Sequence, residues 1–292
     1  MASNNSTRDR SGVFANLHNR AAFIDTLILS IWSDRRPDPV PAIITGPSRP
    51  IAGGPRSHSL YGRCLDLCMK YTGNLGQLQY APLSQFTRVP PLRLLLRSES
   101  LPLTCVETSQ AVDGLCGLSL KHLHVSSLEL TCDLRGFSIS SLEREIFTRT
   151  RRRHEIKDAE GCTTLYFGSR RSACQIRMYD KAADILRVEL ILRRPWLKAN
   201  QITCPGDLIL LRAVDFTPLV DFREFRRNRL DSVLKRNRSD WRRQDLKHQM
   251  NRLSHAELAR LLRTTCRVDP IPLLQPSKAG RLIRRMHSNL VF

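Results

Sequence analysis

The stretch QIRMYDKAADILRVELILRR, residues 175–194, decides the expected fold of this chain. Two strand-like runs rich in apolar residues flank a short segment at 182–184, a pattern typical of an antiparallel hairpin. Side chains two positions apart share one face of a strand. A three-residue turn at 182–184 would therefore gather the polar side chains of both strands on one face, namely Arg177, Tyr179, Lys181, Arg187 and Glu189.

This common face depends on the register of the hairpin. With three turn residues, Tyr179 opposes Arg187 and Arg177 opposes Glu189. A two-residue turn would put the second strand out of phase and send its polar side chains to the other face. The alternative interpretation is an exposed polar face of an antiparallel sheet, which has no function beyond solubility.

Strand-like patterns recur on both sides of the hairpin. Apolar or alternating segments predict further strands at 21–32, 91–100, 124–134 and 163–169. With short connections, the last of these and the hairpin form an antiparallel meander. The sequence therefore predicts an α+β fold with a mostly antiparallel central sheet and flanking helices.

Helical spacing appears in several other segments. Residues 139–150, 206–215 and 219–236 have apolar positions three and four apart, which is typical of amphipathic helices. Ser254 and Glu257 have the spacing of a capping box, so a helix is expected to begin there and run to residue 265.

Composition divides the chain into three parts. Residues 1–20 form a polar segment that we expect to be a disordered tail. Residues 21–204 form the expected strand-rich domain, and six prolines at 34–59 predict a loop within it. Residues 205–292 form a basic helical region with about half of the excess charge.

The formal net charge of +20 favours a polyanionic partner, and nucleic acid is the first candidate. No apolar run is long enough to span a membrane, and the N-terminus does not resemble a secretory signal. The nine cysteines are irregularly spaced, which favours reduced thiols in a cytosolic protein over zinc or a disulfide framework.

A second set of acidic residues lies in VSSLELTCDL, residues 125–134. Glu129, Thr131 and Asp133 share one strand face by the same period of two. Carboxylates that share a face repel one another unless a cation offsets them, and Mg²⁺ or Mn²⁺ prefers such oxygen ligands. A solvated polar face is again the alternative.

These motifs together resemble the rolling-circle replication initiators of filamentous phages, the gene II protein family, which is similar in turn to plasmid initiators of the Rep_trans type. The resemblance covers roughly residues 21–215 and implies that the domain at 21–204 is a catalytic nickase domain. It rests on FIDTLILSI, VSSLELTCDL, RMYDK and RVELILRRPWLK in this order. The chain departs from the family pattern at Ser127, where arginine is usual, at Glu129, where aspartate is usual, and at Val188, where an aromatic residue is usual.

The resemblance assigns roles to individual residues. Tyr179 would be the nucleophile that attacks a DNA phosphodiester, with Lys181 beside it. Glu129 and Glu189 would hold Mg²⁺ or Mn²⁺, and Asp133 would compensate for the longer side chain at position 129. We expect the remaining basic residues of the site to bind DNA, namely Arg177, Arg187, Arg193 and Arg194.

The activity implied by the resemblance is nicking and rejoining of one strand at a replication origin. A phosphotyrosine stores the cleaved bond, and the freed 3′-hydroxyl can prime a polymerase. The expected partners are single- and double-stranded origin DNA together with host helicase and polymerase, in the cytoplasm of a bacterial host. The alternatives are a plasmid mobilisation relaxase and a non-catalytic, basic DNA-binding regulator.

Two further points stay open at the level of sequence. His122 and His124 form a His-hydrophobe-His pattern that offers another pair of metal ligands. In the C-terminal region, Phe222, Phe225 and Trp241 are candidates for stacking on single-stranded bases, and a basic helical cap over the sheet is the alternative.

Overall fold

The computed structural model describes residues 22–31, 49–50, 60–69, 73–83, 89–97, 123–150, 152–159, 161–236 and 240–290. Within these ranges ten strands form one sheet in the order β2-β3-β4-β5-β1-β6-β11-β10-β9-β8, and every neighbouring pair is antiparallel. Its strands are β1 (Phe23–Ile31), β2 (Arg49–Pro50), β3 (Tyr61–Met69), β4 (Gly73–Pro82), β5 (Leu92–Arg97), β6 (His124–Arg135), β8 (Arg153–Lys157), β9 (Thr163–Phe167), β10 (Cys174–Ala182) and β11 (Ile185–Arg193).

Helices and a small second sheet complete the described fold. The sheet has the order β13-β12-β7. These elements are α4 (Ile139–Leu142), β7 (Ile146–Phe147), α5 (Arg194–Ala199), η2 (Pro205–Ala213), β12 (Asp221–Phe225), α6 (Arg227–Arg236), α7 (Asp240–Gln249), α8 (His255–Thr265), η3 (Ile271–Leu273), β13 (Leu274–Pro276) and α9 (Lys278–Ser288). The predicted α+β class with a mostly antiparallel sheet is confirmed.

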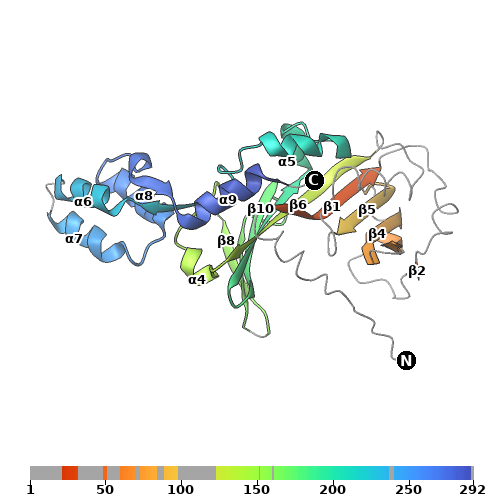
Figure 1. Ribbon diagram of the computed structural model, residues 1–292, viewed down its shortest axis with the longest axis horizontal. Helices are drawn as coiled ribbons and strands as arrows, with labels where there is room; N and C mark the ends of the chain where they lie inside the picture. Colours follow the sequence, from red (N-terminus) through yellow and green to blue (C-terminus); the bar gives the residue numbers. More distant parts are fainter. Residues whose placement is uncertain are drawn as a thin grey trace, which may run out of the picture.

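The main core lies on one face of the large sheet. Along β6, Leu128, Leu130 and Leu134 are fully or almost fully buried, because side chains two apart face the same layer. They belong to one apolar cluster with residues of α5, η2 and α9, such as Leu197 and Ile283. Figure 1 shows α5 and α9 along this side of the central strands. The opposite face therefore carries the polar alternates of the same strands.

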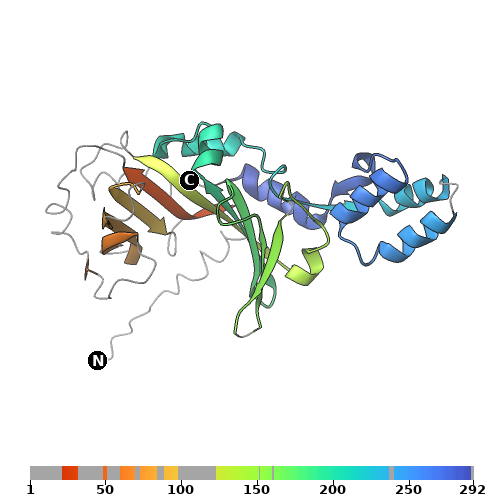
Figure 2. The same cartoon turned by 180° about the vertical axis from the view of Figure 1, so that it is seen from behind.

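A second apolar cluster holds the helices α6, α7 and α8 together. Leu230 and Leu234 of α6 pack with Leu246 of α7 and Leu262 of α8, all 2% exposed or less. The three helices form a lobe at one end of the molecule, and strands β2 to β5 lie at the other end (Figures 1 and 2). We call residues 226–273 the helical lobe.

A buried ion pair ties the connection to this lobe against α9. Asp221, at the start of β12, is 1% exposed and accepts hydrogen bonds from Arg223 at 2.7 Å and from Arg284 of α9 at 2.5 Å. Gly280 lets α9 approach β12 closely, since a Cβ there would lie 2.0 Å from the carbonyl oxygen of Phe222. The ion pair and the close approach at Gly280 therefore both hold β12, which leads into the helical lobe, against α9.

The central hairpin has the predicted pairing but reaches it by a different turn. Arg177 pairs with Glu189 and Tyr179 with Arg187, as expected. The turn has two residues rather than three, because Ala182 pairs with Ile185, and the register shifts at the intervening position 181. This bulge adds the residue that the shorter turn lacks, so the two strands stay in phase.

Two helix predictions were wrong. In segment 139–150, the helix ends at Leu142 and Ile146 lies in strand β7, so tertiary pairing with β12 overrides the local helical spacing. In segment 219–236, residues Asp221–Phe225 form strand β12, and the helix begins only at Arg227. The predicted capping box of Ser254 and Glu257 is confirmed at the start of α8.

Some expectations fall outside the described residues. These are the tail at 1–20, most of the proline-rich segment at 34–59, His122, and the side chain of Trp241, the third candidate for base stacking. Across the described part of the chain, no helix is long and apolar enough to cross a membrane.

Candidate active site

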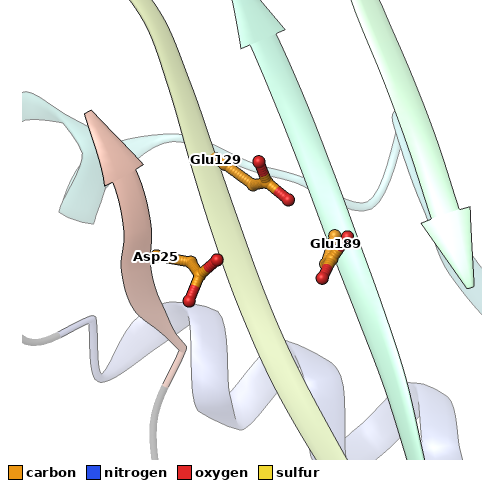
Figure 3. A group of neighbouring side chains, drawn as sticks. All are labelled: Asp25, Glu129 and Glu189. Atoms are coloured by element: carbon orange, nitrogen blue, oxygen red, sulfur yellow. The ribbon is translucent and has the colours of Figure 1, made fainter. Parts of the chain in front are cut away.

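Three carboxylates from three adjacent strands meet on the polar face of the large sheet. Asp25 of β1, Glu129 of β6 and Glu189 of β11 each place a carboxylate oxygen within 4.8 Å of the other two. Figure 3 shows the three side chains directed toward a common space. We call these residues the carboxylate cluster.

Local irregularity brings Asp25 into this cluster. In the β1–β6 pair, Ile24 is opposite Leu130 and Thr26 is opposite Glu129, so Asp25 is an extra residue in a bulge. A bulge bends the strand and redirects the side chains beside it. Asp25 thereby reaches Glu129 although a regular strand would alternate it to the other face.

Glu189 is the most enclosed member of the carboxylate cluster, with its side chain 1% exposed. Its two oxygens have different donors: Arg177 Nε donates to Oε2, and the Tyr179 hydroxyl donates to Oε1 at 2.8 Å. Both donors come from β10, the neighbouring strand. The register of the hairpin therefore places the tyrosine hydroxyl directly on a carboxylate of the cluster.

Arg177 also donates from Nη2 to Glu129 Oε1 at 2.6 Å, so one guanidinium bridges two of the three carboxylates. The single positive charge of Arg177 does not balance the negative charges of the three carboxylates. Burial, and then the nearby charge of Glu189, raise the pKa of Glu129 to about 7. Burial likewise raises the pKa of Asp25, with the charge of Glu189 among the further causes. The three carboxylates therefore repel one another when ionised, and a bound cation would reduce this repulsion.

The hydroxyl of Tyr179 is held in its protonated form when no cation is bound. Burial, and then its hydrogen bond to Glu189, raise the pKa of Tyr179 to about 12. The positive charge of Arg187 acts in the opposite direction. The guanidinium of Arg177 also lies 5.7 Å from the centre of the tyrosine ring. Ionisation of this phenol near neutral pH therefore needs additional positive charge or a proton acceptor.

Asp133 lies on the same sheet face but in a separate ion-pair group. Arg187 binds both of its oxygens, through Nε at 2.7 Å and Nη2 at 2.8 Å, and Lys181 Nζ lies 3.0 Å from Oδ2. Burial opposes ionisation of Asp133, but the hydrogen bonds and charge of Arg187, helped by Lys181, hold its pKa below the usual range. Asp133 is not part of the carboxylate cluster, and its lone pairs already have donors.

The residues present suit a hard divalent cation. Three carboxylates from rigid strands supply the oxygen ligands that Mg²⁺ and Mn²⁺ prefer. Beside them, Thr131 is fully buried and pairs with Glu189 across the strands. Its hydroxyl oxygen has no hydrogen-bond partner among the described residues, so a buried polar atom next to Glu189 is free to interact with a bound group.

The remaining predicted residues lie around this centre. Arg193 is on β11, where its guanidinium donates to the carbonyl oxygen of Ser172 at 2.9 Å and to Gln175 Oε1 at 3.0 Å. Arg194 is the first residue of α5 and is exposed. The structure therefore groups Arg177, Tyr179 and Glu189 at the centre of the site. Arg193 and Arg194 lie where β11 ends and α5 begins.

Two alternatives from the sequence can be placed. A register shift near Ser126 brings His124 opposite Ser30, and His124 is not in the carboxylate cluster. Phe222 and Phe225 are 0% and 9% exposed and belong to the apolar clusters, so their predicted stacking on bases is wrong.

Sequence reasoning missed Asp25 as a candidate ligand. Its position in a polar gap of the apolar run AAFIDTLILSI was the available signal. The sequence shows neither that β1 pairs with β6 nor that a bulge turns Asp25 toward Glu129.

Comparison with known proteins yields one structural similarity to report. No family model matches the chain, and no curated protein matches it. Among solved structures, the chain is similar to one described as "Structure of Rolling Circle Replication Initiator Protein from Geobacillus stearothermophilus". The identity is 16%, the TM-score is 0.46, and the match covers 70% of this chain and 87% of that chain.

Proposed function

We propose that this protein initiates rolling-circle DNA replication by nicking and rejoining one strand, with Tyr179 as the nucleophile. The observation on which the proposal depends is the 2.8 Å hydrogen bond from the Tyr179 hydroxyl to Glu189, a member of the carboxylate cluster. A nucleophile, a proton acceptor and candidate metal ligands thus converge on one face of a rigid sheet. The catalytic unit is the large sheet with its covering helices.

The cations of the site are suited to a phosphodiester. Arg177 and Arg187 flank the tyrosine along the hairpin, and both are held in place by carboxylates. A phosphate placed over Tyr179 would meet their remaining N–H donors, and planar guanidinium groups match phosphate oxygens well. Arg193 and Arg194 would hold the strand further along β11.

The proposed reaction is a transesterification. The Tyr179 oxygen attacks phosphorus and forms a phosphotyrosine, while the bond from phosphorus to the 3′-oxygen breaks. The phenolic proton passes to Glu189 Oε1, its hydrogen-bond acceptor, and the leaving 3′-oxygen takes up a proton from solvent. The reverse reaction rejoins the strand without ATP, because the phosphotyrosine retains the energy of the cleaved bond.

A divalent cation would be held by Asp25, Glu129 and Glu189, which form the carboxylate cluster. When bound, Mg²⁺ or Mn²⁺ would supply positive charge that polarises the phosphate and stabilises its oxygens. The role of Lys181 is to keep positive charge near the nucleophile, and that of Asp133 is to orient Arg187 and Lys181.

Covalent attachment to DNA tests this proposal directly. The purified protein is incubated with labelled single-stranded DNA of random sequence and Mn²⁺, and adducts that survive denaturing electrophoresis are mapped by peptide mass spectrometry. We expect the label on Tyr179, loss of the adduct in Tyr179→Phe, and retention of DNA binding in that variant. Tyr166→Phe is the matched control, because Tyr166 lies on β9 and stacks on His154.

Two results would overturn the proposal. An adduct that persists in Tyr179→Phe would assign the nucleophile to another residue. If the unaltered protein binds DNA but forms no adduct with Mn²⁺ or, in a parallel incubation, with Mg²⁺, the non-catalytic DNA-binding regulator becomes the better interpretation.

A further inference from the structure

We infer that the helical lobe binds double-stranded DNA through the outward face of α6, a surface separate from the single-strand site on the large sheet. This inference rests on the proposed function and deepens it, since it assigns the duplex part of the substrate to a different surface from the cleaved strand.

The helical lobe is an independent apolar unit with a strongly basic surface. It has its own buried cluster, separate from the core beneath the large sheet. Its sequence holds thirteen Lys and Arg against five Asp and Glu. A lobe that only capped the sheet would bury a face against it, whereas Figure 1 shows α6, α7 and α8 extending away from the sheet.

Helix α6 is amphipathic in a way that favours DNA. Leu230 and Leu234 point into the lobe. The outward face, at the helical spacing opposite these two leucines, is formed by exposed residues: Asn228, Arg229, Ser232, Lys235 and Arg236. Basic residues thus flank two uncharged hydrogen-bonding side chains, and the neighbouring Asp231 is the only acidic residue within α6.

The cations on this face are not used for internal structure. In the described part of the chain, Arg229, Lys235 and Arg236 have no ion pair and donate no side-chain hydrogen bond, whereas Arg177, Arg187 and Arg284 have carboxylate partners. Unpaired cations on a folded helix are available for phosphates, and each one that neutralises a phosphate releases counterions.

Duplex DNA fits this surface better than a single strand does. Single strands are held largely by stacking on aromatic side chains, and the sequence of α6 contains none. A rigid helix with Asn and Ser between basic residues instead suits the major groove, where arginine and lysine contact phosphates and polar side chains reach base edges. The cleaved single strand would occupy the polar face of the large sheet.

The test compares a triple variant with a charge-matched control. The variant Arg229→Gln, Lys235→Gln, Arg236→Gln removes three cations from α6. The control Lys157→Gln, Lys198→Gln, Arg212→Gln removes three exposed cations from β8, α5 and η2. Binding of a labelled 20-base-pair duplex and of a single strand of equal length is measured by fluorescence anisotropy between 50 and 250 mM salt.

We expect the α6 variant to lose duplex affinity selectively. Each phosphate contact contributes about 0.9 to the slope of log affinity against log salt, so its loss costs about eightfold at 0.1 M salt. Loss of two to three phosphate contacts in the triple variant should weaken duplex binding roughly 60-fold to 500-fold at 0.1 M salt and reduce the slope by about two to three. Single-strand affinity and covalent adduct formation on single-stranded DNA should equal those of the control.

Three results would overturn the inference. The first is a duplex affinity no lower than that of the control variant. The second is a single-strand affinity that falls by as much as the duplex affinity. The third is competition of anionic lipid vesicles with duplex, together with an equal loss of vesicle binding in the variant. Because adduct formation is measured separately, failure of the Tyr179 chemistry leaves the duplex comparison interpretable, and failure of the duplex comparison leaves the Tyr179 chemistry intact.

Discussion

Removing the Asp133 carboxylate tests how the polar face of the sheet is held together. Asp133 is 5% exposed and the side chain of Arg187 is 13% exposed, and two hydrogen bonds of 2.7 and 2.8 Å join them. Asp133→Ala would leave a guanidinium enclosed without its counter-charge. Breaking such a buried pair costs about 3 kcal/mol, while Lys181, whose side chain is 42% exposed, adds under about 1 kcal/mol.

Urea unfolding at pH 7, followed by circular dichroism, measures this cost. The double variant Asp133→Leu, Arg187→Met should recover most of the loss, because no uncompensated charge remains. The lowered pKa of Asp133 means that its contribution is complete above the ordinary value of 3.8 and is lost as pH falls below it through the folded-state pKa. A cost below about 1 kcal/mol for Asp133→Ala would refute the reasoning, because that is the range of an exposed pair.

Two further predictions concern the carboxylate cluster and the attachment of α9. In the metal-free protein the pKa of Glu129 is raised from 4.5 to about 7, so the folded state binds more protons than the unfolded state between these values. Its contribution to stability is therefore greatest at low pH and falls as pH rises through this window, and Glu129→Gln should flatten the fall in urea midpoint between pH 5 and pH 7.5; an unchanged slope would contradict the assignment. Gly280→Ala should destabilise the protein by about 1 to 3 kcal/mol, because the new Cβ would collide with the backbone of Phe222. Gly206→Ala, whose Cβ would meet only the sulfur of Cys204 at 3.8 Å, is the control and should shift the thermal midpoint much less.

The polar face of the hairpin could be predicted from the sequence because a strand has a period of two. The alternation of polar and apolar residues in β10 and β11 indicates which side chains share a face, whatever covers the other side. The turn itself was not predictable at this level. A two-residue turn with a bulge at Lys181 and a three-residue turn preserve the same phase, so the pairing of Tyr179 with Arg187 holds in either case.

Contacts between strands that are distant in the sequence were harder to predict. Glu129 and Asp133 share a face and look equivalent by spacing, but their partners come from other strands. Glu129 meets Asp25 and Arg177, whereas Asp133 meets Arg187 and Lys181. The same limit explains the helix predictions that were wrong, because β7 forms by pairing with β12, and β12 forms by pairing with both β7 and β13.

The balance of charges shows why the two acidic groups on this face have different roles. Asp133 is matched by Arg187 and Lys181, so its group is already satisfied. Among the described residues, the three carboxylates of the carboxylate cluster have only Arg177 as an ion-pair partner. Burial, and then the charge of Glu189, raise the pKa of Glu129 to about 7. A divalent cation would favour ionised Glu129, and it would bring the fully ionised cluster with Arg177 from a net charge of about −2 to about zero. A phosphodiester could then approach Tyr179 without the repulsion that the metal-free cluster would exert on it.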